Sequence, residues 1–205
     1  MPPRVKSRTE PGRDAILVAG RELFAERGFN AASVSEIAAR AGIAKSVIYH
    51  HFGSKAGLYE AIVEAETGDL LDRVAAAVPA EGAGARRLRP GLDAYLGFLE
   101  QNPAAWRLLL RDAPVDPELV KVDERLRRDR SEALAALLAG THKGSRRSAE
   151  KALHADLLTT GIRAFAAWWY EHREIPREQV LEAILAFSDA GMDVITGRSK
   201  SRKSR

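Results

Sequence analysis

Four polar side chains of different chemistry lie close together between positions 45 and 50. Lys45 supplies a cation, Ser46 a hydroxyl, Tyr49 a phenol and His50 an imidazole. Together these groups can hydrogen-bond to base edges and hold phosphate oxygens through charge or hydroxyl donors. Such a set suits binding to nucleic acid, provided that one element presents all four side chains on a single surface.

The element that carries them is predicted to be a short helix over 43–52. Ile43, Ile48 and Phe52 mark its inner face, with Val47 beside them, so the four polar residues point outward. A helix of this kind needs a partner that buries its apolar side, and the preceding residues supply one.

A second short helix is predicted immediately before it. Ser33-Val-Ser-Glu36 is a capping box, in which the serine hydroxyl and the glutamate carboxylate each satisfy the other residue's backbone amide. Ile37 and Ala38 follow on the buried side, and Gly42 ends the helix. Two short helices joined by a tight glycine turn have the layout of a helix-turn-helix.

An earlier helix completes a three-helix head. Ile16, Ala19, Leu23 and Phe24 form one apolar stripe, and Gly28 is placed to end the helix in a left-handed cap. In a helix-turn-helix the second helix lies in the DNA major groove. The residue types therefore favour DNA binding, while a generic helical module with a polar outer face stays open as the alternative.

Composition sets the broad class of the protein. The 205 residues are 45% hydrophobic and 29% charged, which is ordinary for a globular chain. There is no cysteine, so disulfides and thiolate metal sites are excluded. No apolar run approaches the length of a membrane span, and no signal peptide is recognisable at the N-terminus. We expect a cytoplasmic protein without membrane contact.

Charge is unevenly distributed along the chain. Residues 1–55 carry nine Lys/Arg and five Asp/Glu, and residues 197–205 carry five Lys/Arg and no acid, whereas the middle is acidic. A basic end attracts polyanions, although a surplus this small is equally compatible with an ordinary solvated surface. Arg4, Lys6, Arg8 and Arg13 form an arm that could reach DNA phosphates.

The rest of the chain is predicted to be helical as well. A long helix runs from about 55 to 78, a loop covers 79–91, and further helices are expected at about 90–101, 103–112, 117–139, 148–172 and 177–196. The fold class is therefore all-α. We divide the chain into a disordered basic arm (1–9), a helix-turn-helix domain (10–54), a helical ligand-binding and dimerisation body (55–196) and a disordered basic tail (197–205).

The last two helices are apolar on more than one face. In 148–172, Leu157 and Trp168 lie on one stripe and Ile162 and Trp169 on its neighbour, and 177–196 has the same character. A surface helix needs one apolar stripe, so the second stripe predicts packing against a second subunit. A central helix in a monomeric core is the alternative.

No enzyme site is predicted. His154 and Asp156 are two residues apart on a helix and face different ways, as do His50 and His51. The segment 140–145 lacks the spacing of a phosphate-binding loop. We expect no catalytic residue, no metal and no cofactor.

The segment from Gly28 to Tyr59 closely resembles the N-terminal domain of the TetR family of transcriptional regulators. The resemblance is specific over about 12–62 and only architectural beyond. It implies a homodimeric, sequence-specific DNA-binding regulator, usually a repressor, that binds a pseudo-palindromic operator and is released by a small ligand. Carried over by position, the DNA-facing residues are Ser33, Ser35, Lys45, Ser46, Val47, Tyr49, His50, His51 and Lys55.

Two positions depart from the family pattern. Ala44 stands where a polar capping residue is frequent, which removes a cap worth about 1 kcal/mol. Val47 can offer bases only an apolar contact. For both reasons the operator sequence does not carry over from other members of the family.

The resemblance also implies a ligand pocket in the body, and the aromatic residues favour a largely apolar ligand. The candidate lining residues are Tyr95, Phe98, Asn102, Trp106, His154, Thr159, Arg163, Phe165 and Trp169. The alternatives to a ligand-controlled repressor are an activator or DNA-architectural protein without a ligand and, less favoured, a helical small-molecule-binding protein.

Overall fold

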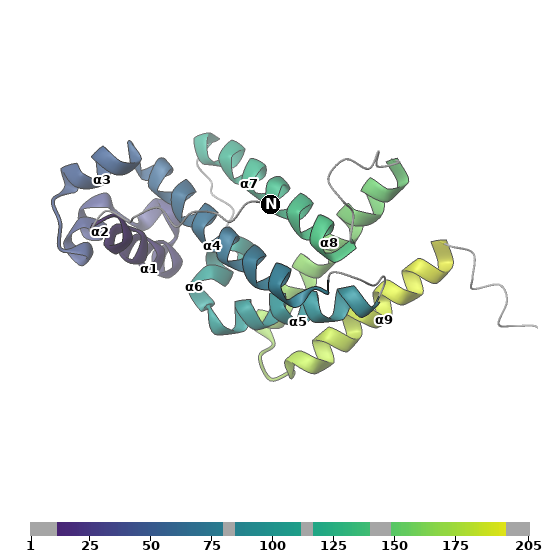
Figure 1. The fold of residues 1–205 in the computed structure, drawn as a ribbon. Coiled ribbons are helices and arrows are strands. Elements are labelled where there is room, and N and C mark those ends of the chain that lie inside the picture. The colour runs from purple at the N-terminus through teal and green to yellow at the C-terminus, as the bar shows by residue number, and fades with distance from the viewer. Residues whose placement is uncertain (1–11, 80–84, 112–116, 140–148, 196–205) are drawn as a thin grey trace, which may run out of the picture. The chain divides into compact units, whose positions relative to one another are not determined.

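The computed structural model describes residues 12–79, 85–111, 117–139 and 149–195 (Figure 1). The predicted arm at 1–9 and tail at 197–205 lie outside these residues. The described residues form α-helices and one π-helical turn, without a strand, as the all-α prediction requires. The elements are α1 (Arg13–Ala31), α2 (Val34–Ala41), α3 (Lys45–Phe52), α4 (Lys55–Ala77), α5 (Ala85–Gln101), α6 (Pro103–Trp106), η1 (Arg107–Arg111), α7 (Pro117–Ala139), α8 (Ala149–Glu171) and α9 (Arg177–Ile195).

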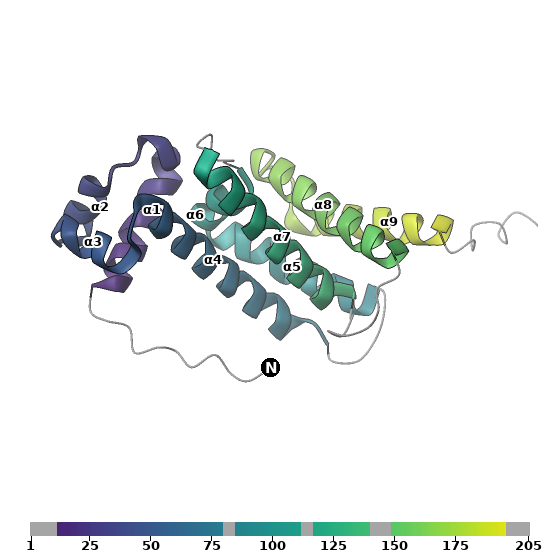
Figure 2. The same cartoon turned by 90° about the horizontal axis from the view of Figure 1, so that it is seen from above.

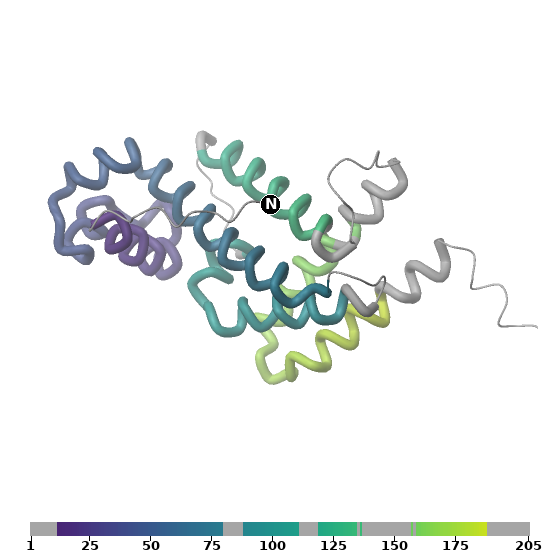
Figure 3. The backbone as a smooth tube through the Cα atoms, viewed as in Figure 1, coloured from purple at the N-terminus to yellow at the C-terminus, as the bar shows by residue number. Residues whose placement is uncertain are grey.

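The chain forms two compact units. Unit 1 contains Met1–Gly68 and Asn102–Arg127, and unit 2 contains Asp69–Gln101 and Arg128–Arg205. Helices α4 and α7 each contribute residues to both units, and the backbone runs through them without a break (Figure 3). Unit 1 therefore includes a segment far along the sequence, α6 and η1, together with α1 to α3. The predicted division after residue 54 remains a prediction about function.

Helices α1, α2 and α3, called the head below, share one apolar core. Ile16, Leu23 and Phe24 of α1 are buried, as their predicted stripe requires, and Ile37 of α2 and Ile48 of α3 are each 0% exposed. Burying a side chain of this size stabilises the fold by about 1.5–3 kcal/mol. The core fixes which face of each helix points outward.

Local signals in the sequence set the bounds of α2. Ser33 and Glu36 form the predicted capping box, and Gly42 ends the helix in the left-handed region at φ 69° and ψ 31°. The amide of Ile43 then bonds to the carbonyl of Ala38, at 3.0 Å, which closes the turn into α3. The helix-turn-helix geometry is therefore built from a serine cap and a glycine turn.

Gly28 differs from the prediction in one respect. It has a positive φ of 74°, but its ψ of 169° lies outside the left-handed helical region, and the helix resumes until Ala31. The residue makes a kink instead of ending the helix, because the amide of Ala32 still finds the carbonyl of Gly28 at 3.3 Å. The kink changes the direction of the chain just before α2.

The inner face of α3 is less deeply buried than predicted. Ile48 is enclosed, whereas Ile43, Val47 and Phe52 are only half-buried. Arg13 covers the Phe52 ring, with its guanidinium carbon 5.4 Å from the ring centre. In α3, Ile48 alone lies fully in the core, and the flanking apolar residues lie at its edge.

The start of α4 closes the head. The Ser54 hydroxyl accepts from the Gly57 amide at 3.0 Å, which caps the helix. A Cβ at Gly57 would lie 2.2 Å from the carbonyl oxygen of Phe52, so only glycine allows α3 and α4 to meet this closely.

In unit 2, α5 is longer than predicted. The loop expected over 79–91 and the helix start near 90 are both corrected, because α5 begins at Ala85 and contains Pro90. Pro90 is past the first turn of α5, so it removes one intrahelical hydrogen bond, and the helix nevertheless continues to Gln101. Arg89 of α5 forms ion pairs with Glu178 and Glu182 of α9, and these tie the two helices together.

Helices α8 and α9 lie side by side in unit 2 (Figure 2). Of the two stripes predicted on α8, Ile162 and Trp169 are buried, whereas Leu157 is 60% and Trp168 46% exposed. On α9, Ile184 is buried and Phe187 is 67% exposed. The two stripes of α8 therefore have different environments, whereas on α9 Leu181 and Ile184, from neighbouring predicted stripes, are both buried.

Candidate nucleic-acid interface

The predicted outward face of α3 is exposed. Lys45, Ser46, Tyr49 and His50, called the α3 ridge below, all reach solvent, and Tyr49 is 42% exposed. The Lys45 ammonium lies 5.6 Å from the centre of the Tyr49 ring, which brings a cation and a phenol to one place. The ridge thus offers charged, hydroxyl and ring groups on the exposed surface of α3, while Ile48 is buried in the core of the head.

The N-terminus of α3 adds backbone donors to this surface. Ala44 is extended and provides no side-chain cap, and the first turn contains no acid. The first amides of a helix lack intrahelical acceptors and carry a partial positive charge. In the absence of a capping side chain, a phosphate oxygen can satisfy them.

Val47 and His51 lie at the sides of the α3 ridge. Both are half-buried, and the His51 ring contacts the rings of His50, at 5.5 Å, and Phe52, at 6.0 Å. Each can therefore touch a ligand only along its exposed edge. Their contact with DNA stays a prediction.

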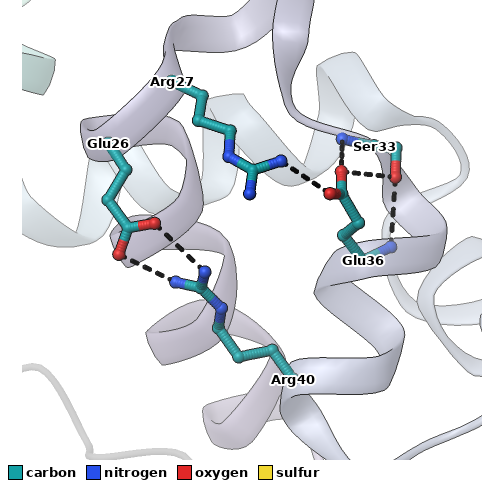
Figure 4. A network of polar contacts seen from close by, with 5 residues as sticks. All are labelled: Glu26, Arg27, Ser33, Glu36 and Arg40. Atoms are coloured by element: carbon teal, nitrogen blue, oxygen red, sulfur yellow. Dashed lines mark hydrogen bonds and ion pairs between the residues drawn. The ribbon is translucent and has the colours of Figure 1, made fainter.

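Ser33 is committed within the head. Its hydroxyl accepts from the Glu36 amide at 3.1 Å and donates to the Glu36 carboxylate at 2.8 Å, which uses its proton (Figure 4). Ser35, by contrast, is exposed. A phosphate could take the Ser33 proton only in competition with Glu36, so Ser35 is the better placed of the two predicted contacts.

Lys55 is also held by the head. Its ammonium lies 3.4 Å from the Asn30 carbonyl and 4.3 Å from the centre of the Phe29 ring. The side chain therefore fastens the start of α4 to the chain just after the Gly28 kink. Because an ammonium has three donors, this arrangement is compatible with a further bond to phosphate.

A network of ion pairs between α1 and α2 was not predicted. Arg40 of α2 holds the Glu26 carboxylate with two bonds of 2.9 and 3.0 Å, and Arg27 of α1 bonds to Glu36 at 2.6 Å (Figure 4). The hydrogen bond from Arg40 lowers the pKa of Glu26, and those from Ser33 and Arg27 lower the pKa of Glu36. No sequence signal identifies these partners, because they belong to different helices and share no periodic spacing.

Comparison with known proteins identifies the family. The model for "Bacterial regulatory proteins, tetR family" matches residues 16–62, and the model for "Tetracyclin repressor-like, C-terminal domain" matches residues 85–191, more than half of the chain. The chain belongs to the TetR family of transcriptional regulators. As a TetR-family member it is a DNA-binding transcriptional regulator and not an enzyme, and the head is its helix-turn-helix domain.

Two relatives match most of the chain. The HTH-type transcriptional activator FasR of Mycolicibacterium smegmatis is 28% identical over 186 residues, which cover 88% of this chain and 82% of FasR. A tetR-family regulator from Streptomyces coelicolor has a similar structure, with a TM-score of 0.75, 25% identity and coverage of 92% of this chain and 83% of that one.

A third protein shares the fold. FadR of Bacillus subtilis, whose structure is described in complex with stearoyl-CoA, has a TM-score of 0.68 at 19% identity and covers 84% of this chain and 97% of its own. At this identity the likeness concerns the fold alone. Among the described residues of this chain, no helix is both long and apolar enough to cross a membrane.

The predicted pocket residues are divided between the two units. Asn102 and Trp106 belong to unit 1, and Tyr95, Phe98, Thr159, Arg163, Phe165 and Trp169 to unit 2. The side chain of His154 lies outside the described residues. Trp169 has a structural task, since its indole donates to the Ile175 carbonyl at 2.8 Å and closes the turn between α8 and α9.

Within unit 2, Tyr95 has the environment of a polar group set in an apolar core. It is 3% exposed, and burial raises its pKa to about 12 against the opposing charges of Arg130 and Arg163. The phenol therefore keeps its proton near neutral pH and can donate a hydrogen bond. Phe98, three residues later on α5, is also buried, and Arg163 of α8 is half-buried.

Proposed function

We propose that two copies of the chain bind a pseudo-palindromic operator through their α3 ridges, and that a small, largely apolar ligand releases the DNA. The observation that carries the proposal is the position of the α3 ridge, which is exposed on a helix anchored by fully buried Ile48. In a dimer, two such helices lie about one DNA turn apart, or 34 Å. Such a regulator acts in the cytoplasm, where the DNA is.

The direct experiment is a binding titration with DNA from upstream of the protein's own gene. We expect saturable binding that weakens as salt rises, because phosphate contacts release counterions. Random DNA of the same length is the control. Equal affinity for both DNAs at every salt concentration would contradict sequence-specific binding.

The homodimer is supported by the apolar side chains that remain exposed on α8 and α9. Leu157, Trp168 and Phe187 are among the large hydrophobic residues most exposed in the described part of the chain, and a second subunit would cover them. Phe187→Glu should shift the chain toward monomer in sedimentation experiments. Val18→Glu is the matched control, since Val18 is 54% exposed but lies on α1; an unchanged Phe187→Glu dimer would contradict this interface.

The ligand is proposed to enter the body in unit 2. Buried Tyr95 offers a neutral donor and Arg163 a positive charge, while the surrounding apolar core suits a hydrocarbon chain. Palmitate and stearoyl-CoA are suitable probes, the second because it is the ligand of the same-fold FadR protein. Each should raise the melting temperature of the wild type and do so less in Tyr95→Phe; equal shifts in both proteins would exclude Tyr95 as a contact.

The direction of regulation is proposed to be repression, because an operator-bound dimer blocks access to overlapping promoter DNA. Activation is the second candidate, favoured by the name of FasR, a relative described as a transcriptional activator that matches 88% of the chain. A reporter driven by the bound promoter separates the two: deleting the regulator raises expression if it represses and lowers it if it activates. No change in expression would favour an architectural role.

A further inference from the structure

The last turn of α1 before the Gly28 kink is held from two directions. The carbonyl of Ala25 accepts from Nη1 of Arg107 at 3.2 Å, and Arg107 comes from η1. The next two residues, Glu26 and Arg27, form the ion pairs with α2 described above. Three consecutive residues of α1 therefore link η1 on one side to α2 on the other, all within unit 1.

The Ala25 carbonyl lies three residues before the non-helical Gly28, where the helix changes direction. The Arg107 guanidinium gives this carbonyl a charged donor from outside α1. Hydrogen bonds from charged donors are stronger than those from backbone amides. The contact thus stabilises the end of the straight part of α1.

Arg107 is also electrostatically connected to the ion pair that holds α2. The bond from Arg40 is the main cause of the lowered pKa of Glu26, and the charges of Arg27 and Arg107 act in the same direction. One carboxylate on α1 therefore senses both the α2 arginine and the η1 arginine.

Arg107 lies at the junction of α6 and η1, so the contact connects α1 to both of these elements. The residue follows α6 and begins a π-helical turn, and both α6 and η1 pack against α1. Turns of this type are rare and frequently occur at functional sites. A shift in α6 or η1 would reach the last turn of α1 through this guanidinium.

We propose that Arg107 is a positioning residue for DNA binding, which holds the turn of α1 just before Gly28 and thereby fixes α2 and the α3 helix that follows it. Arg107 itself does not touch DNA in this scheme. The inference rests on the proposed function, because it assigns control of the same interface to a residue outside the head.

The first test measures operator affinity of full-length Arg107→Ala. We expect binding weaker by about five- to twentyfold, in line with the loss of one charge-assisted hydrogen bond. Arg107→Lys, which can still donate to the carbonyl, should stay within about threefold of wild type. Arg125→Ala is the matched control, since it removes the same charge from unit 1 but its partner is Glu60 on α4. Equal losses in Arg107→Ala and Arg125→Ala would overturn the inference.

The second test asks whether the effect passes through the link to α2. In an Arg40→Ala background, Arg107→Ala should cost less than about twofold, because neighbours in one network couple when mutated together. The same fold-loss in both backgrounds would overturn the proposed route, even if DNA binding by the wild type is established.

A third measurement needs no DNA. Hydrogen exchange of the α2 amides, Val34–Ala41, should be faster in Arg107→Ala than in wild type, while Arg107→Lys stays near wild type. Unchanged exchange in α2 would exclude Arg107 as a positioning residue. Absence of sequence-specific binding by the wild type would instead contradict the proposed function, so the two failures can be told apart.

Discussion

Helices α2 and α3 have eight residues each and follow one another in the chain, yet they use their polar side chains in opposite ways. In α2, Glu36 and Arg40 are bound to Ser33, Arg27 and Glu26. In α3, Lys45, Ser46 and Tyr49 face solvent, and the helix start has no side-chain cap. The polar side chains of α2 therefore fasten it to α1, whereas those of α3 remain exposed and able to bind a ligand.

The same difference separates two serines predicted to contact DNA. Ser33 closes a capping box, whereas Ser46 lies on the α3 ridge. Their chemistry is identical, and only the surrounding helix decides whether the hydroxyl is available. Residue type alone is therefore a weak guide to function within the head.

The largest effect on stability should come from the one fully buried side chain of α3. Ile48→Ala should lower the free energy of unfolding by about 2–5 kcal/mol, because it removes buried surface and leaves a cavity. Urea denaturation measures the change. A loss below about 1 kcal/mol would show that α3 is held by something other than this side chain.

An intermediate effect on the free energy of unfolding is expected for the N-terminal cap of α2. Ser33→Ala should cost about 0.5–2 kcal/mol of stability, since it breaks the cap of α2. Ser46→Ala, a matched change on the α3 ridge, should stay within about 0.5 kcal/mol of wild type. Equal costs in the two variants would remove the distinction between α2 and α3.

The smallest effect concerns acid pH. The pKa values of Glu26 and Glu36 are lowered in the folded chain, by the hydrogen bonds from Arg40 and Ser33 respectively. A lowered pKa contributes stability that is present above the ordinary value of about 4.5 and is lost as pH falls through the folded value. The wild type should melt slightly above Glu26→Gln/Glu36→Gln at pH 7, and this gap should shrink as pH falls below about 4.5. A gap that stays the same from pH 7 down to acid pH would mean that the carboxylate charges are not its cause.

Much of the head could be predicted because its signals are local. The capping box at Ser33, the glycine turn at Gly42 and the stripe from Ile16 to Phe24 each depend on residues near in sequence, and the structure confirms all three. The helical residues Ala85–Gly91 were missed because the segment 79–91 is rich in Ala, Gly, Pro and Arg, a composition typical of loops. Packing in the folded chain outweighs such local preferences.

The contacts that hold the head together could not be predicted in the same way. Arg40 meets Glu26, and Arg107 meets Ala25, only after α2 and η1 have packed against α1. The hydrogen bond from Lys55 to the Asn30 carbonyl likewise joins residues that are far apart in the sequence. For the candidate site, the sequence identifies which residues α3 turns outward. Only the tertiary fold shows that Lys55, also predicted to contact DNA, already hydrogen-bonds to the head, as Ser33 does through its capping box.

We propose that the α3 ridge reads the DNA sequence, while α2 holds the ridge in place and contacts only the DNA backbone, through Ser35. The most direct measurement is selection of preferred sites from random DNA by the wild type, by Lys45→Ala/Tyr49→Ala and by Arg27→Ala/Arg40→Ala. We predict that the α3 variant loses the wild-type sequence preference, and that the α2 variant keeps it with lower affinity for every site. Retention of the wild-type preference by the α3 variant, with its fold intact, would contradict the account.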